Sequence, residues 1–555
     1  MSVYVGIYDD HNAGFAAVDE DGIVEYAEFE RLTRIKNQDG WLPDLVGRCF
    51  DALPLERLRA VTAPRPELVK ELLCRRYGAV TGETGTVLLE GKLIRLLPQP
   101  DLHGYFHLLA ATTIPMADPG IYLVIVFDAE QPRFGWIDLR EPLAGSDARA
   151  LTPVTDERWF NGAVFGDLFG RLFYGSGDLS NCGKLMGLSS WGTPRLKHVE
   201  YLERLAQDTF DPTVETWNGY CSGSADNVSI VAEEHLGVSP RNHESSLTLD
   251  LAASAQAMFT HRFVEQVQSG CRRARAQIRD SGITDEPIGV LYGGGCALSV
   301  VSNSEVRDVV GLPLFIPPFA HDASQFVGGA VWAGLVDGMR WTAGRGWSGI
   351  PEHTAGRVSS ASAAKAGYPM EPASPSAVAE IIARGGLVAL ARGGSEAGPR
   401  ALGNRSLLAR ATDPGIRDRL NEQVKKREWY RPFAPMLPTQ EFPRYFDATA
   451  SPASAYMLDS YRARPRFRRL LSSVTGPDGI ARAQSVDAAT DPFLHQVCYE
   501  LGRLTGDPVL LNTSLNAPGR TIAYDLTQVV DDSIELGVDA VVVDGAFLDV
   551  RGNLR

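Results

Sequence analysis

The chain has 555 residues, which is enough for about two to four domains with ordinary hydrophobic cores. Its 54 Lys and Arg against 68 Asp and Glu give a net charge of −14, so no overall positive field draws it to nucleic acid or anionic lipid. With 44% hydrophobic and 22% charged residues, the composition excludes a largely disordered, collagen-like or coiled-coil chain.

Cysteine usage and the apolar runs indicate the compartment. The seven cysteines are odd in number and form no CxxC pair, which favours a reducing setting. The start, MSVYVGIYDDH, has acidic residues where a signal peptide needs a basic flank, and the apolar run at residues 121–127 is too short to cross a bilayer. We therefore expect a soluble, cytoplasmic protein without a membrane partner.

Strand-like runs alternate with helices and turns in the first part of the chain. Strands are predicted at residues 3–8, at 13–18, from Ile23, at 121–127 and at 288–291. The first three form an antiparallel meander with a functional loop at residues 9–12, and residues 249–279 predict a helix. The Gly-rich segments 183–192 and 293–303 predict small-residue turns, which either admit a ligand or allow close packing.

A composition change separates this part from the rest. Residues 338–375 are rich in Gly, Ala, Ser and Pro, as is typical of a linker or a loop-rich boundary. After it, a helix at 377–383 and strands at 386–391 and 508–511 predict a second α/β domain. The expected division is a domain at 1–350, a linker at 351–375 and a domain at 376–555.

Two histidines four residues apart suggest a metal site. On a helix, His103 and His107 in HGYFHLLAA project from one face about 5 to 6 Å apart, near enough to share one cation. Asp128 at the end of a strand and Asp322 in a small-residue turn are candidate further ligands. Imidazoles with carboxylates suit Fe, Mn or Zn better than Mg or Ca. The alternative is a pair of partly exposed helix histidines.

A third histidine and a basic segment offer further chemistry. His11 in the first turn is either a general base for a hydroxyl nucleophile or a solvated turn residue. The segments at 393–409 and 420–436 place basic residues among Gly and Pro, which indicates a pocket for phosphate or carboxylate rather than a solvated basic face. The loop LLNTSLNAPG after residue 511 adds neutral donors, among them Asn512 and Ser514. No Walker motif is present.

Together these motifs resemble the O-carbamoyltransferase family of antibiotic and nodulation-factor biosynthesis. The resemblance runs in order over nearly the whole chain: GIYDDHNAGFAAV, EFERLTRIK, HGYFHLLAA, VFDAE, GKLMGLSSWG, GGGCALSVVSN, HDASQFVGGA, GPRALGNRS, VKKREWYRPFAP, DGIARAQSV and LLNTSLNAPG. The sequence departs from the family pattern at Asn12, Gly104 and Gly476, which bears on the pocket for the acceptor.

The resemblance implies an α/β protein with two activities. A Kae1-like domain, of the duplicated actin and Hsp70 type, carries an iron site and is followed by a YrdC-like domain. The YrdC-like domain makes carbamoyl adenylate from carbamoyl phosphate and ATP with Mg²⁺. The Kae1-like domain moves the carbamoyl group to a hydroxyl of a secondary metabolite, such as a glycosylated macrolide or aminoglycoside antibiotic. Fe²⁺ is the implied metal, with Mn or Zn as alternatives, and a homodimer is expected by analogy.

The resemblance also implies roles for particular residues. His103, His107 and Asp322 stand at metal-ligand positions with Asp128 close by, and His11 stands where the family places its base. The positions that hold carbamoyl phosphate and nucleotide are Arg400, Lys425, Arg431, Arg482 and Ser514.

Two other functions compete with this one. A tRNA threonylcarbamoylation enzyme uses related domains, but the net charge of −14 and the lack of a long basic stripe weigh against a nucleic-acid partner. A non-enzymatic nucleotide sensor would bind ATP without turnover, and the Lys425 and Arg431 cluster argues against an inert pocket.

Overall fold

The computed structural model describes most of the chain. The described residues are 1–82, 85–100, 102–116, 118–145, 151–154, 159–178, 180–209, 228–237, 239–347 and 351–550. The boundary expected at residue 350 and the last five residues lie outside them. Among the described residues, no helix combines the length and apolar character that a membrane crossing requires.

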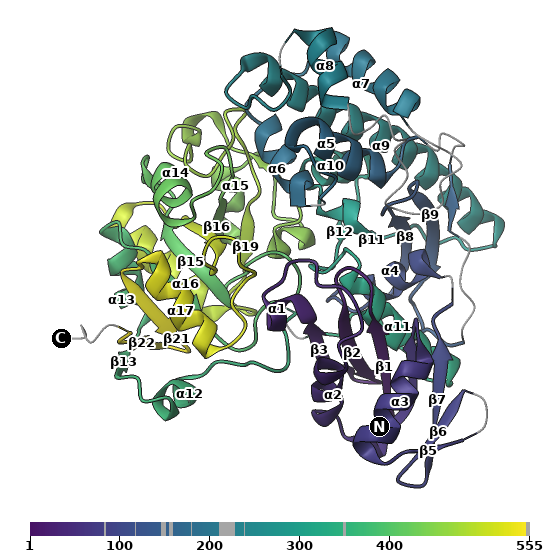
Figure 1. Cartoon of the computed structure of the whole chain (residues 1–555). Helices are drawn as coiled ribbons and strands as arrows, with labels where there is room; N and C mark the ends of the chain where they lie inside the picture. The colour runs from purple at the N-terminus through teal and green to yellow at the C-terminus, as the bar shows by residue number, and fades with distance from the viewer. Residues whose placement is uncertain are drawn as a thin grey trace.

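The first sheet contains seven described strands in the order β3-β2-β1-β4-β7-β6-β5 (Figure 1). Its strands are β1 (Val3–Tyr8), β2 (Gly14–Asp19), β3 (Gly22–Glu28), β4 (Leu58–Ala63), β5 (Val80–Thr81), β6 (Thr86–Leu89) and β7 (Lys92–Pro98). Strand β1 pairs antiparallel with β2 and parallel with β4. The meander predicted at the N-terminus is confirmed, and every residue of β1 is buried because helices cover both faces of the sheet.

The second sheet repeats this pattern. Among the described residues its order is β10-β9-β8-β11-β12, with β10 (Thr152–Pro153), β9 (Arg133–Asp138), β8 (Ile121–Val126), β11 (Gly289–Gly293) and β12 (Leu314–Phe315). Strand β8 pairs antiparallel with β9 and parallel with β11, as β1 does with β2 and β4. The repeat agrees with the duplicated domain that the resemblance implies.

Helices join the two sheets and cover their outer faces. Helix α4 (His103–Ala111) and helix α11 (Ala323–Val336) pack on each other, α11 against β1 and α4 against β8 and β11. The 35-residue helix α9 (Ser246–Asp280) covers β9 and confirms the helix predicted there. The other described helices before residue 350 are α1 (Phe29–Thr33), α2 (Pro43–Asp51), α3 (Pro66–Tyr77), α5 (Phe169–Tyr174), α6 (Ser180–Ser189), α7 (Leu196–Thr209), α8 (Val228–Leu236) and α10 (Val300–Val310).

The C-terminal part is built on a third sheet, in the order β13-β22-β21-β14-β15-β20-β16-β19. Its strands are β13 (Met370–Pro372), β14 (Val388–Ala391), β15 (Arg405–Arg410), β16 (Ala434–Pro438), β19 (Gln484–Val486), β20 (Leu510–Ser514), β21 (Ala540–Val543) and β22 (Ala546–Leu548). Helices α13 (Pro375–Ala383) and α16 (Pro492–Thr505) share a core with one face, and α17 (Leu526–Leu536) with the other. The predicted α/β class is confirmed.

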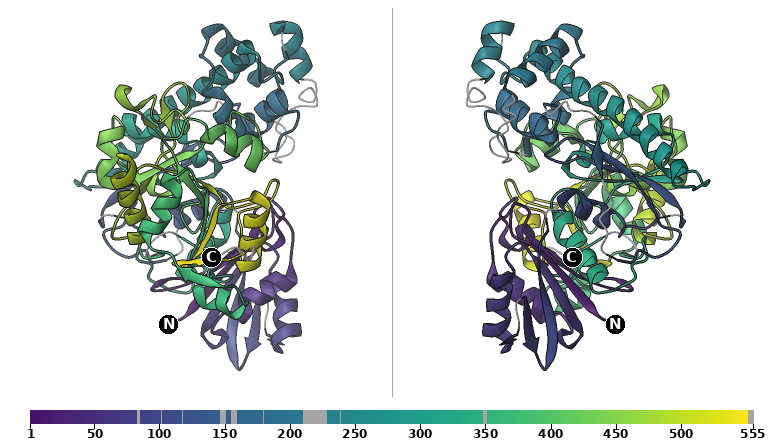
Figure 2. Two further views of the ribbon diagram at one scale, coloured as in Figure 1. Left: turned by 90° about the vertical axis from the view of Figure 1, so that its left-hand side faces the viewer. Right: turned by 90° about the vertical axis from the view of Figure 1, so that its right-hand side faces the viewer.

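The smaller described elements complete the C-terminal part. Strands β17 (Tyr461–Arg462) and β18 (Ile480–Ala481) form a two-stranded ribbon, and the short helices are α12 (Ser360–Lys365), α14 (Ile416–Asp418) and α15 (Phe442–Tyr445). The two side views, each turned by 90° from Figure 1, show this part lying against both halves of the N-terminal part (Figure 2). Some buried residues of this part belong to the same hydrophobic core as the second sheet, namely Ala397, Leu402, Tyr430, Ala434, Ala453 and residues 456–458.

Two local predictions are wrong. Residues 183–192 are not a turn: helix α6 runs through Ser189, because Gly187 packs closely against Tyr430 and Pro432 rather than breaking the helix. Asn512 and Ser514 lie in strand β20 rather than in a loop after residue 511, because pairing with β15 continues to Ser514. In both segments tertiary packing overrides local propensity.

Candidate functional site

Three structural elements bring the predicted metal ligands to one place. His103 and His107 lie on helix α4, Asp128 follows β8 by two residues, and Asp322 is the residue before helix α11. The ends of parallel strands β8 and β11 meet here, where Gly294 has a φ of 98° and a Cβ would lie 2.2 Å from the Phe127 carbonyl oxygen. Only glycine permits this approach.

The four side chains converge closely. One ligand atom from each of His103, His107, Asp128 and Asp322 lies within 4.8 Å of the others. Nε2 of His103 is 2.9 Å from Asp128 Oδ2, 3.2 Å from Asp322 Oδ1 and 3.1 Å from His107 Nε2. The sequence spacing alone could not show that these two carboxylates reach the imidazoles.

Charge pairing dominates the electrostatics of the group. Burial opposes charge on His103, but Asp128 and Asp322 outweigh it and raise the pKa of His103 to about 11. Burial and Asp128 also oppose ionisation of Asp322, yet His103 and His11 lower its pKa to about 2. His11 contacts Asp322 through Nε2, and Asp10 and Asp322 raise its pKa to about 10 against the effect of burial. The carboxylates are therefore ionised and available as ligands.

The group fits a transition-metal cation. Asp322 Oδ1 is buried and lacks a hydrogen-bond partner among the described residues, so it is an acceptor without a donor. Two imidazole Nε2 atoms 3.1 Å apart cannot both carry protons directed at each other, but both can face one cation. Ser324 on α11 contacts His107 Nδ1, which leaves Nε2 to face the group.

Basic side chains gather on the opposite wall. Arg400, Lys425, Arg427 and Arg431 all line the same cavity as the His/Asp group. Burial and then Arg431 lower the pKa of Arg400 to about 10. Burial, followed by the charges of Arg400, Arg427 and Arg431, lowers the pKa of Arg482 as well. Such a concentration of cations favours a ligand with several negative charges.

Three polar residues predicted at this wall, Lys425, Ser514 and Asn512, have different surroundings in the structure. The Lys425 ammonium donates to the carbonyl oxygens of Ser514 (2.6 Å) and Asn516 (2.9 Å) and to Asn516 Oδ1 (2.9 Å), so it braces the end of β20. Ser514 lines the cavity. Asn512 is buried in the sheet, where its amide donates to the Ala401 carbonyl oxygen (2.9 Å) and to Gln484 Oε1 (2.7 Å). Asn512 therefore supports the wall from behind.

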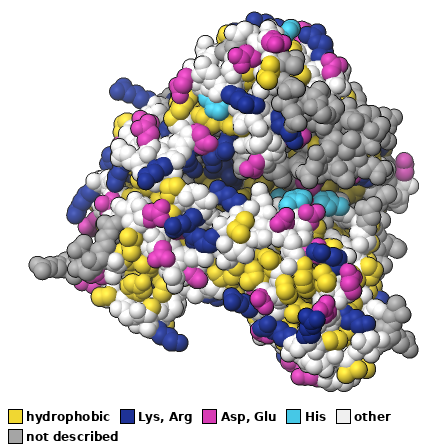
Figure 3. Space-filling view, viewed as in Figure 1, with side chains coloured by type: hydrophobic (Ala, Val, Ile, Leu, Met, Phe, Trp, Pro, Cys, Tyr) yellow, Lys and Arg dark blue, Asp and Glu magenta, His cyan; other side chains and the backbone are white. Residues whose placement is uncertain are grey.

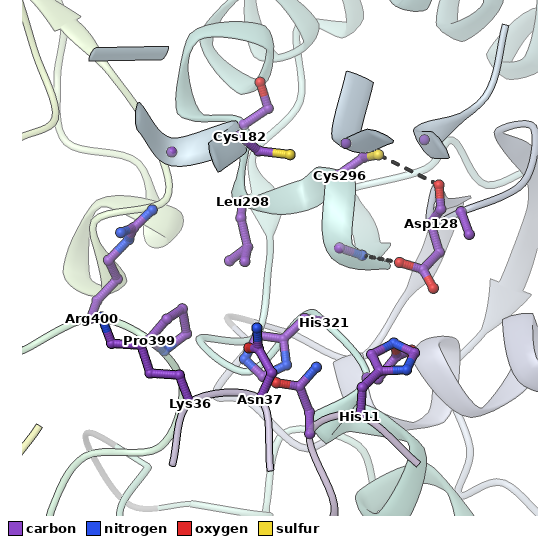
Figure 4. A pocket seen from close by; sticks show the side chains of 18 of the residues that line it. His11, Lys36, Asn37, Asp128, Cys182, Cys296, Leu298, His321, Pro399 and Arg400 are labelled. Atoms are coloured by element: carbon purple, nitrogen blue, oxygen red, sulfur yellow. Dashed lines mark hydrogen bonds and ion pairs between the residues drawn. The ribbon is translucent and has the colours of Figure 1, made fainter. Parts of the chain in front are cut away.

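One cavity of about 1050 Å³ joins the two groups. In the space-filling view, Lys and Arg side chains gather in a hollow of the surface and histidine side chains lie at its right-hand side (Figure 3). In the close-up, His11 and Asp128 lie on one side and Arg400 on the other, with Cys182 and Cys296 above (Figure 4). Burial raises the pKa of the Cys182 thiol to about 12, which favours the protonated thiol over a nucleophilic thiolate.

Sequence reasoning missed several residues of this cavity. His321, Lys36 and Asn37 line it, between His11 and Pro399 in the view of Figure 4. His321 begins the HDASQFVGGA motif, Lys36 ends the EFERLTRIK motif and Asn37 directly follows it, so these residues lay within or beside motifs already noted. The motifs pointed to these parts of the chain, but the residue spacing did not indicate which side chains face the cavity.

The fold and the site define a class: an α/β protein in which a His/Asp group suited to a metal and an Arg/Lys group suited to anions face one cavity. Residues 379–549 match the family described as "Carbamoyltransferase C-terminus". The predicted relationship to the carbamoyltransferase family is confirmed by this domain and by homology to nodulation proteins.

Two of these relatives show the extent of the similarity. Nodulation protein U of Sinorhizobium fredii is 30% identical over 392 residues, which are 68% of this chain and 65% of that protein. Nodulation protein NolO of Bradyrhizobium diazoefficiens is 36% identical over 174 residues, or 31% of this chain and 32% of that protein. The chain thus spans less than two thirds of the length of either relative.

Solved structures are more distant. (R)-2-hydroxyglutaryl-CoA dehydratase component A of Acidaminococcus fermentans aligns with 60% of this chain and 97% of its own. The sequence identity is 12% and the TM-score 0.31.

Proposed function

We propose that the protein is an ATP-dependent O-carbamoyltransferase. The C-terminal domain, expected at 376–555, would make carbamoyl adenylate from carbamoyl phosphate and ATP, with release of phosphate and pyrophosphate. The N-terminal domain, expected at 1–350, would transfer the carbamoyl group to a hydroxyl. The observation that carries this proposal is the single cavity of about 1050 Å³ whose walls hold both the Arg/Lys group and the His/Asp group.

The Arg/Lys group supplies the chemistry of the first step. Carbamoyl phosphate and ATP bring several negative charges together, and guanidinium groups that hold oxygens in pairs offset their repulsion and orient them for reaction. Arg400 and Arg431 line the cavity for this role. Lys425 fixes the Ser514 backbone, so it shapes the site rather than contributing a free ammonium.

His11 serves the second step. It lies in the turn between β1 and β2 and lines the cavity. Asp322 contributes to the raised pKa of His11, so with Asp322 engaged as a metal ligand that pKa would fall and the neutral imidazole could take the proton of the acceptor hydroxyl. His103, His107, Asp128 and Asp322 would hold the cation, for which Fe²⁺, Mn²⁺ and Zn²⁺ are the candidates. A cation at this position would neutralise charge on the phosphate oxygens of the nucleotide.

For the acceptor we propose a bulky hydroxylated natural product, such as a glycosylated antibiotic. The cavity volume supports an acceptor of that size beside a nucleotide. Incubation of the protein with ATP, carbamoyl phosphate and a panel of such compounds tests this by mass spectrometry. The expected product carries one added carbamoyl group.

The decisive experiment measures pyrophosphate release from ATP with and without carbamoyl phosphate. We expect release only with carbamoyl phosphate, and a loss of at least about tenfold in Arg431→Ala, because the removed guanidinium faces the cavity. Arg503→Ala is the matched control, since this exposed arginine on α16 pairs only with Glu500 among the described residues. Release that ignores carbamoyl phosphate, or an unimpaired Arg431→Ala enzyme, would refute the proposal.

A further inference from the structure

The EFERLTR segment contacts the C-terminal part through two buried charged residues. Glu28 ends strand β3 and Arg31 lies in helix α1, and both are almost fully buried. Glu28 Oε1 accepts a hydrogen bond from the Gly398 N–H at 2.7 Å. Arg31 Nη2 donates to the carbonyl oxygens of Gly398 and Glu396, the latter at 3.5 Å. Two side chains of the first sheet therefore hold the backbone of residues 396–398.

This backbone leads directly to Arg400. Gly398 has a φ of 84°, and a Cβ there would lie 2.1 Å from the Pro318 carbonyl oxygen. The loop therefore packs directly against Pro318, which shortly precedes the candidate ligand Asp322 in the chain. Two residues further on, Arg400 extends into the cavity (Figure 4). The position of the Arg400 guanidinium thus depends on how firmly residues 396–398 are held.

The loop is also stiff within itself. Glu396 Oε1 accepts from three backbone N–H groups, those of Leu402 (2.5 Å), Asn404 (3.1 Å) and Arg405 (3.2 Å). A loop tied together in this way moves as a unit. Contacts at residues 396–398 are therefore transmitted to Arg400.

The cavity wall needs such a restraint. Arg400 faces Arg431 and lies near Arg482, and like charges repel each other in a partly buried site. Without an anion between them, this repulsion favours movement of the Arg400 loop away from the wall. Glu28 and Arg31 oppose that movement through contacts that do not involve the ligand.

We propose that Glu28 and Arg31 are positioning residues of the donor site: from the N-terminal sheet, they hold the Gly398 backbone so that Arg400 is preorganised for carbamoyl phosphate. This inference rests on the proposed function and deepens it. Preorganisation lowers the cost of binding, so loss of either residue weakens the affinity for the anion although neither touches it.

The test is calorimetric binding of carbamoyl phosphate, with inorganic phosphate as a second probe. The variants are Glu28→Met, which nearly keeps the shape of the side chain but removes the acceptor of the Gly398 N–H, and Arg31→Lys, which keeps the charge but loses the planar group. We expect carbamoyl phosphate to bind about tenfold more weakly to both variants, which corresponds to about 1.4 kcal/mol. In pyrophosphate release, KM for carbamoyl phosphate should rise while KM for ATP changes less.

Asp459→Asn is the matched control. Asp459 is a buried carboxylate before β17 that pairs with Arg307 of α10 at 2.5 Å, so it joins the same two parts of the chain without contacting residues 396–398 or lining the cavity. We expect its carbamoyl phosphate affinity to stay within about twofold of the wild type at a comparable loss of melting temperature. Equal weakening in this control would assign Glu28 and Arg31 a structural role only and overturn the inference.

The remaining outcomes are also decisive. Unchanged affinity in both Glu28→Met and Arg31→Lys overturns the inference. A wild type that binds neither anion overturns the proposed function and the inference with it. A wild type that binds carbamoyl phosphate but releases no pyrophosphate overturns the proposed function alone, because the affinities of the variants still decide the inference.

Discussion

His353 makes the stability of the protein sensitive to acid. The side chain is fully buried, and neither ring nitrogen has a hydrogen-bond partner among the described residues. The ring packs edge-on against Tyr26 and Tyr524, with centroids 5.2 and 5.5 Å away. Burial lowers the pKa of His353 from 6.5 to about 3, so the imidazole stays neutral in the folded protein at mildly acidic pH.

The size of the effect follows from proton binding. Between pH 6.5 and about 3 the unfolded chain protonates His353 while the folded chain does not, so the free energy of unfolding falls as the pH falls. The slope is about 1.4 kcal/mol per pH unit below the unfolded pKa. At about pH 5 the loss amounts to about 2 kcal/mol, and above about pH 7.5 it is negligible.

The assay compares wild type with His353→Phe, which keeps an aromatic ring against both tyrosines. Urea unfolding at about pH 7.5 and about pH 5 gives the change in free energy for each protein, and all other titrating groups contribute equally to both. We expect the wild type to lose about 2 kcal/mol more than the variant. Equal losses would show that His353 is protonated in the folded state and refute the reasoning.

Three further predictions concern the cavity. His107→Ala should abolish metal binding, measured by metal analysis, but keep carbamoyl phosphate-dependent pyrophosphate release; unchanged metal content would contradict the ligand assignment. Ser324→Ala should weaken metal binding about tenfold or more in a Zn²⁺ titration, because the partner of His107 Nδ1 is lost, and unaltered affinity would count against it. Gly398→Ala should lower the free energy of unfolding by at least about 2 kcal/mol, since an alanine there meets both a left-handed backbone and the Pro318 carbonyl oxygen; a smaller loss in urea would mean that the loop can move.

Local patterns predicted the elements that carry the site. The apolar run at residues 3–8 and the helix-forming segment at 249–279 depend on neighbours in sequence, and both elements form as expected. The i,i+4 spacing likewise placed His103 and His107 on one helix face. Where packing rather than propensity decides, as in α6, the local pattern failed.

Long-range contacts could not be predicted in the same way. Glu28 and Gly398 are 370 residues apart in sequence, and their hydrogen bond depends on how two sheets meet. The sequence also gave no reason to separate Asn512, which faces the interior of the sheet, from Ser514, which reaches the cavity. Side chains two residues apart in a strand face the same side, so alternation does not separate these two; Ser514 ends β20 and reaches the cavity, whereas Asn512 lies farther inside the sheet.

The sequence by itself determined the chemical groups of this protein: its histidines and carboxylates, its basic segment and the family that its motifs resemble. Only the tertiary structure decided that a His/Asp group from α4, β8 and α11 and an Arg/Lys group from the C-terminal part face one cavity. The physical reason is that side-chain chemistry belongs to each residue, whereas the distance between remote residues is set by the packing of whole sheets and helices.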